Sequence, residues 1–188
     1  MKILEIIKIE WKWAFMNKGQ KMEFLHQKYP SGGSYFTNIV YNSLPKRLKR
    51  MFKNFSSEEI LELLSIPILG STTAFSSILL TTQENSVRVI LDKLNDYDLF
   101  RCLNLIEDAS YNYISFLNLT SSHILITKSA PALVDYILTR NNKEQRDHIM
   151  NLKGKTEISV GKLANERASK DSDFAKVLSK YFPLIYLN

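Results

Sequence analysis

The chain of 188 residues has very little cysteine or glycine, and this excludes several kinds of site. Cys102 is the only cysteine, so an intramolecular disulfide is excluded and a cysteine-based zinc site is not expected. Cys102 stands among apolar neighbours, which predicts a buried, inert thiol and a reducing compartment. The 6 glycines form neither of the glycine-rich motifs that cradle phosphates.

Long hydrophobic runs are also missing. No 18 apolar residues follow one another, so no membrane-spanning helix is expected. Glu5, Lys8, Glu10 and Lys12 interrupt the apolar residues at the start, where a secretory signal needs about 7–15 in a row. We therefore expect a cytoplasmic protein, and export by a signal of another kind stays open.

Recognisable catalytic patterns are absent as well. The histidines are His26, His123 and His148, and none of them belongs to a His-Glu-x-x-His run or to a pair spaced by four residues. Asp147 and His148 could be combined with Cys102 as a thiol-hydrolase set, but the sequence does not support that combination. We predict no catalytic residues, no metal site and no cofactor.

Aromatic residues, by contrast, are plentiful. The chain contains 10 Phe, 9 Tyr and 2 Trp, and its hydrophobic fraction is 45%. A chain of this length can bury about 70% of the surface that its unfolded form exposes. One domain with an ordinary hydrophobic core is therefore expected, without the help of a metal or a cross-link.

The positive charge is concentrated at the N-terminal end. Residues 1–55 hold 11 Lys or Arg and 3 Glu, a net charge of +8, whereas the rest of the chain has a net charge of −2. An anionic partner should therefore be sought in the first 55 residues.

Residues 1–30 form an N-terminal element whose periodicity is ambiguous. Ile7, Ile9, Trp11, Trp13 and Phe15 alternate with polar residues as in a strand, with a turn at residues 17–19 leading to a second strand. The same stretch also carries a helical stripe, and we favour helix over hairpin. Packing of both tryptophans on the body is expected, and the alternative is a membrane-interface patch. The Pro-Ser-Gly-Gly-Ser run at 30–34 separates this element from a body over residues 34–188.

The body is predicted to be all-α and built from stacked short helix pairs. One helix follows Ser43, with Leu44, Leu48, Met51, Phe52 and Phe55 on one face. Ser56 and Glu59 form a capping box, and Ser129, Asn142 and Asp171 are further expected N-caps. The remaining helices are expected over residues 57–64, 72–82, 86–94, 97–107, 111–117, 122–128, 130–140, 143–151, 159–168 and 172–181.

Residues 70–182 resemble a divergent set of ankyrin repeats. Gly154-Lys155-Thr156-Glu157-Ile158 is similar to the opening turn of such a repeat, with Glu157 where proline is usual, and Gly70–Phe75 is similar to an earlier opening. The middle unit lacks that signal and begins with Ser121-Ser122-His123. Leu91, Leu138 and Leu178 would close the units at spacings of 47 and 40 residues, whereas ankyrin repeats recur about every 33. The alternative is an irregular α-helical domain.

What the resemblance implies is a non-catalytic binding scaffold for other proteins, such as a bacterial adaptor, inhibitor or secreted effector. The family supplies no fixed binding residues, so the candidate site comes from the charges. Five cations, Lys46, Arg47, Lys49, Arg50 and Lys53, lie within one predicted helix. On that helix Lys46, Arg50 and Lys53 would share a face opposite the apolar stripe. A protein partner is the first hypothesis, and peripheral binding of an anionic membrane or a nucleic acid through residues 44–55 is the alternative.

Overall fold

The computed structural model describes residues 9, 11–30, 32–68, 72–80, 83–105, 120–153 and 157–182. Its helices are α2 (Lys18–His26), α3 (Tyr35–Asn42), α4 (Pro45–Met51), α5 (Ser57–Leu64), α6 (Ala74–Leu79), α7 (Glu84–Leu91), α8 (Asp96–Leu103), α9 (Ser121–Lys128), α10 (Pro131–Thr139), α11 (Lys143–Asn151), α12 (Val160–Ala168) and α13 (Ser172–Tyr181). The predicted all-α fold is confirmed. The expected helix over 111–117 lies outside the described residues, and the other expected helices are present with their ends shifted by a few residues.

Strands are minimal in the described ranges. The named strands there are β1 (Pro67–Ile68) and β2 (Thr72–Thr73), two residues each. They pair antiparallel and precede α6 in the sequence. Their pairing closes a loop and adds no sheet layer.

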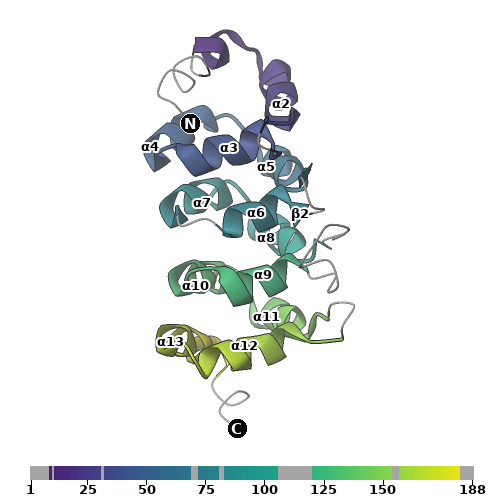
Figure 1. Ribbon diagram of the computed structural model, residues 1–188, viewed down its shortest axis with the longest axis vertical. Helices are drawn as coiled ribbons and strands as arrows, with labels where there is room; N and C mark the ends of the chain where they lie inside the picture. The colour runs from purple at the N-terminus through teal and green to yellow at the C-terminus, as the bar shows by residue number, and fades with distance from the viewer. Residues whose placement is uncertain are drawn as a thin grey trace.

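The helices are arranged in three rows along the long axis (Figure 1). The first row contains α3, α6, α9 and α12, and each of these helices packs on the next. A second row, α4, α7, α10 and α13, lies along one side, and a third row, α5, α8 and α11, lies toward the other. The predicted helix pairs are therefore present, and a third helix follows the first three pairs.

Successive units have different lengths. The helices of the first row begin at residues 35, 74, 121 and 160, which are 39, 47 and 39 residues apart. The longer middle step contains residues 106–119. The first unit begins at Ser34, well before the residue-70 start that the sequence indicated.

A closed loop precedes each helix of the first row. The N–H groups of Tyr35, Ala74, Ser121 and Val160 donate to the carbonyls of Gln27, Ile66, Leu105 and Leu152, at 3.0, 2.8, 3.1 and 2.9 Å. Gly32, with φ of 100°, makes the reversal in the first of these loops. The same backbone contact thus sets the start of all four helices.

A hydroxyl residue occupies the N-cap of each of these helices: Ser34, Thr73, Thr120 and Ser159. The hydroxyls of Ser34, Thr73 and Ser159 each accept from the backbone N–H three residues ahead, at 3.2 Å. Each such bond satisfies an N–H that would otherwise lack a partner in the first turn. The last unit therefore opens at Ser159, and Thr156, where the sequence placed the opening, lies outside the described residues.

The other caps were predicted with mixed success. The Ser56–Glu59 capping box, the Asn142 cap and the Asp171 cap are confirmed. The Ser129 cap is wrong, because Ala130 is the N-cap of α10 and the Ser129 hydroxyl donates to the carbonyl of Leu79 at 3.0 Å. Proline at the first position of α10 already removes one unsatisfied N–H, so a capping side chain matters less there.

The core runs through all the units. Leu91, Leu138 and Leu178 are buried, with 0, 0 and 2% of their surface exposed, as predicted. Leu44 was expected on the apolar face of its helix, and this is wrong. Leu44 is the N-cap residue before Pro45, where the chain is still extended, and its side chain is 77% exposed.

The N-terminal element is helical where it is described. Residues 11–15 form a helical segment, and Asn17 caps α2 by accepting from the N–H of Gln20, so the expected turn at 17–19 is the start of a helix. Trp13 is buried, with ring contacts to Phe24, Phe52 and Phe55, whereas Trp11 is 69% exposed. The packing prediction is therefore right for Trp13 and wrong for Trp11.

His123 ties α9 to the loop before α12. The N–H of Thr120 donates to Nδ1 of His123 at 3.2 Å, so that nitrogen carries no proton. The other nitrogen, Nε2, then carries the proton and donates it to the carbonyl of Ile158 at 3.1 Å. The neutral ring satisfies both contacts, and burial lowers the pKa of His123.

We expect Leu138→Ala to lower the free energy of unfolding by about 2–5 kcal/mol, the range for a large-to-small change in a packed core. Denaturant melts measure it, and Leu44→Ala is the matched control. Because Leu44 is exposed, its change should stay within about 0.5 kcal/mol. Similar values for the two variants would show that the helical phase is wrong.

The buried neutral histidine also predicts a pH dependence of stability. Because the pKa of His123 is lower in the folded chain than its ordinary value of about 6.5, the unfolded chain binds the proton more readily. The stabilisation is complete above about pH 6.5 and is lost as the pH falls through the folded pKa. Urea melts between about pH 7.5 and about pH 5.5 should show a weaker pH dependence for His123→Gln than for the wild type and for the exposed-site control His148→Gln. Equal pH dependence in all three would contradict the assignment.

Candidate functional site

The cations predicted to bind a partner lie on and just after α4. Leu48 and Met51 anchor this helix in the core. Lys46, Lys49 and Arg50 are exposed and Arg47 is half-buried.

Lys53 differs from the prediction in its setting. The helix ends at Met51, so Lys53 stands in the following turn and not on the helical face expected for Lys46, Arg50 and Lys53 together. Its side chain is nevertheless exposed, while its carbonyl accepts from Nζ of Lys93 at 2.9 Å. The lysines at 46, 49 and 53 are therefore all available to solvent.

These three lysines differ from the cations on the rest of the second row. Within the part of the chain that the structure describes, Lys46, Lys49 and Lys53 have no carboxylate partner. On α7, Arg88 pairs with Glu84 at 2.6 Å. On α13, Lys176 pairs with Asp173 at 2.9 Å, and Lys180 pairs with Asp135 of α10 at 3.0 Å. Among the described lysines on the helices of the second row, Lys46 and Lys49 therefore differ from Lys176 and Lys180, which are paired. We call Lys46, Lys49 and Lys53, which lie on and just after α4, the lysines of α4.

Three polar side chains of α10, those of Asp135, Tyr136 and Arg140, join neighbouring units. The guanidinium of Arg140 donates to the carbonyls of Leu91 and Leu94 at 2.7 and 2.6 Å, and to the carboxylate of Asp96 at 2.9 Å. It thereby holds the end of α7 and the start of α8 against α10. Tyr136 adds a hydrogen bond to Asp92, and its partial burial is the largest cause of its raised pKa.

Asp135 plays the same part between α10 and α13. Its carboxylate accepts from the hydroxyl of Tyr181 at 2.7 Å and from Nζ of Lys180 at 3.0 Å. The Tyr181 hydrogen bond is the main cause that lowers the pKa of Asp135. Because these side chains hold one another, we assign them to packing between units.

Cys102 and His148, the thiol and the histidine considered together for chemistry, lie on α8 and α11. Cys102 is buried, and burial raises the pKa of its thiol to about 12, so the thiol is protonated at neutral pH, as predicted. The ring of His148 contacts Asn104 at 3.0 Å through Nε2. In the described ranges, no three His, Cys, Asp or Glu side chains gather as metal ligands would.

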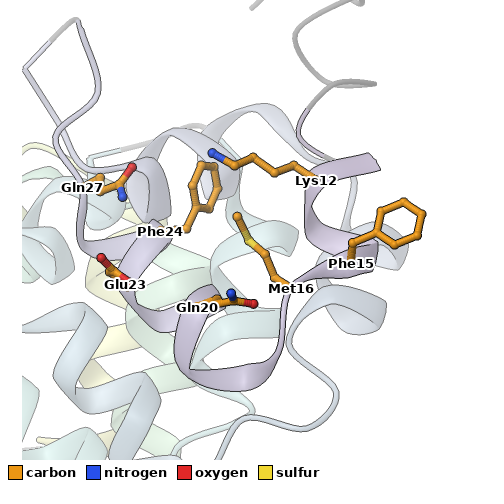
Figure 2. A pocket seen from close by; sticks show the side chains of 7 residues that line it. All are labelled: Lys12, Phe15, Met16, Gln20, Glu23, Phe24 and Gln27. Carbon is orange, nitrogen blue, oxygen red and sulfur yellow. The ribbon is translucent and has the colours of Figure 1, made fainter.

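A hollow of about 470 Å³ lies between the helical segment 11–15 and α2 (Figure 2). Its lining residues are Lys12, Phe15, Met16, Gln20, Glu23, Phe24 and Gln27. Phe15 is 78% exposed and lies beside Trp11, which was considered for a membrane-interface patch from the sequence, whereas Phe15 was not. The spacing of Trp11 and Phe15 at i and i+4 was the available signal, but it competed with strand-like alternation in the same residues.

Comparison with known proteins gives no further guide. No protein-family model, curated protein or solved structure matches the chain significantly. The described helices also include none that is both long and apolar enough to span a bilayer.

The contacts of Arg140 lead to a prediction about stability. Arg140→Leu should lower the free energy of unfolding by about 2–4 kcal/mol, because two helix-end carbonyls lose a charged donor. Chemical denaturation measures it. The control Lys180→Leu breaks an exposed ion pair and should cost less than about 1 kcal/mol. An Arg140 effect no larger than that of Lys180 would argue against its role as a clamp between units.

Proposed function

We propose that the chain is a non-catalytic scaffold that binds an acidic partner protein through the lysines of α4. The observation that carries the proposal is a contrast along the second row: Lys46, Lys49 and Lys53 are exposed and have no carboxylate partner among the residues that the structure describes, while the lysines of α13 are paired. Complementary charge steers association and selects partners, so unpaired cations at this density favour an acidic surface.

The shape of the molecule supports a scaffold. Stacked units form long rows of helices, and such arrays commonly serve to bind other proteins. We further propose that the units are divergent ankyrin-like repeats. The hydroxyl N-caps, the closed loops and the paired helices support this, while the third helix and the steps of 39 and 47 residues depart from the usual repeat of about 33. An adaptor, inhibitor or effector role fits a scaffold of this kind.

Binding of a nucleic acid or an anionic membrane by the same lysines is the second candidate. The specific observation in its favour is the clustering of the five cations between Lys46 and Lys53. Polyanions bind such clusters by counterion release, and this makes their affinity fall steeply as salt rises. An acidic protein shows a milder salt effect, mainly on the association rate.

The test compares two triple variants with the same charge change. The α4 variant is Lys46→Glu, Lys49→Glu, Lys53→Glu, and the control is Lys128→Glu, Lys162→Glu, Lys170→Glu, whose lysines are exposed on later units. Each variant changes the formal net charge of +6 by −6, to zero. Arg47 and Arg50 are left intact, so that contacts within the fold are not disturbed.

Three assays are run in parallel at low and high salt. They are affinity capture from cell lysate followed by mass spectrometry, binding to short duplex DNA, and binding to phosphatidylserine vesicles. We expect a defined set of proteins to be captured by the wild type and the control variant and to be lost from the α4 variant by about tenfold or more. Steeply salt-dependent binding of DNA or vesicles, abolished only in the α4 variant, would replace the proposal with the second candidate. Equal protein capture together with equal DNA and vesicle binding by all three proteins would contradict both.

A further inference from the structure

Two aromatic side chains lie exposed side by side at the N-terminal end of the stack. Trp11 and Phe15 are 69 and 78% exposed, and their ring centroids are 5.5 Å apart. The other large apolar side chains exposed among the described residues are Leu44, Leu80 and Tyr97, which stand on separate elements. Adjacent exposed aromatic rings are typical of a surface that binds another apolar surface.

The orientation of this pair is fixed by its neighbour. Trp13, on the same helical segment, is 9% exposed and stacks on Phe55 with an interplanar angle of 14°. Because successive helical positions point in different directions, burial of Trp13 leaves Trp11 and Phe15 on the outer side. Figure 2 shows Phe15 lying away from Phe24 while Lys12 reaches over the Phe24 ring. The exposed pair is thus held in place by a packed anchor.

The segment that carries the pair, together with α2, has a net positive charge. Residues 11–30 hold four Lys and one Glu, a net charge of +3. Lys12 Nζ lies 5.4 Å from the centre of the Phe24 ring, and Lys21 Nζ lies 5.4 Å from that of Trp13, so both cations lie over rings that pack beneath the segment. Lys18 is partly neutralised by Glu59 at 2.8 Å. We call Trp11, Phe15, Lys12 and Lys21 the aromatic–lysine patch.

We propose that the aromatic–lysine patch docks on an anionic membrane surface, with Trp11 and Phe15 inserted at the level of the headgroups. Tryptophan favours that zone because its ring is apolar with one polar N–H, and surface-bound helices combine such residues with lysine. Each lysine near an anionic leaflet strengthens binding by about fivefold.

Other occupants fit less well. A second copy of the same patch would bring two surfaces of equal positive charge together. A nucleic-acid base cannot stack between the two rings, because the ring centroids of Trp11 and Phe15 are only 5.5 Å apart and their planes are inclined by 43°. The membrane surface satisfies the apolar pair and the cations at once, and this attachment is separate from the partner binding assigned to α4.

The patch also provides its own reporter. The chain has 2 tryptophans, and Trp13 is buried. Quenching of tryptophan fluorescence by brominated phosphatidylcholine in phosphatidylserine-containing vesicles therefore reports the insertion of Trp11. Vesicle co-sedimentation gives the affinity in parallel, and thermal melts check that each variant is folded.

We expect the wild type to bind phosphatidylserine-containing vesicles with quenched fluorescence, and to bind pure phosphatidylcholine vesicles at least about tenfold more weakly. Trp11→Ala with Phe15→Ala should reduce binding to the anionic vesicles by about tenfold or more without changing the net charge. Lys12→Glu with Lys21→Glu should also weaken it by about tenfold or more. The matched control, Leu80→Ala with Tyr97→Ala, also removes two exposed apolar side chains and should bind like the wild type.

Three results would each overturn the inference: absence of wild-type binding to anionic vesicles, binding without quenching, or unchanged binding by the folded Trp11→Ala, Phe15→Ala variant. Failure of the membrane proposal would leave the proposed binding of a partner protein untouched. The aromatic variant keeps all the lysines of α4, so lysate capture by that variant tests whether the scaffold function survives.

Discussion

The architecture depends on the closed loop in front of each first-row helix. One backbone hydrogen bond from the first residue of the helix, with a hydroxyl at the N-cap, fixes where α3, α6, α9 and α12 begin. Since the four starts share this geometry, the helices meet as a regular row. The second and third rows follow from it because the connections within each unit are short. The lysines of α4 and the N-terminal aromatic pair are held at one end of this frame.

Short-range signals made much of the fold predictable. N-caps such as Ser56 and Asp171, together with the period of the apolar residues, located the helices because both act over a few residues. They also predicted the burial of Leu138 and of Cys102. The first unit was missed because its cap is a serine, Ser34, and the glycines before it, Gly32 and Gly33, were interpreted as a break between two parts of the chain.

The arrangement between units was not predictable from the sequence. Ion pairs such as Lys180–Asp135 join residues 45 positions apart, and no local pattern indicates them. The exposure of Lys46 and Lys49 followed from the amphipathic pattern of α4. Whether a described carboxylate lies near them depends on which helix packs beside α4, and no local pattern indicates that. The orientation of Trp11 and Trp13 likewise depends on Phe52 and Phe55, which lie far along the chain.

The central claim is that an acidic protein docks on the lysines of α4. Lysine-reactive cross-linking in lysate, read by mass spectrometry of the wild-type chain, tests it most directly because the candidate residues are themselves the reporters. The account predicts that cross-links to other proteins concentrate at Lys46, Lys49 and Lys53. Cross-links that favour Lys128, Lys162 and Lys170, which are also exposed and lie on later units, would contradict it.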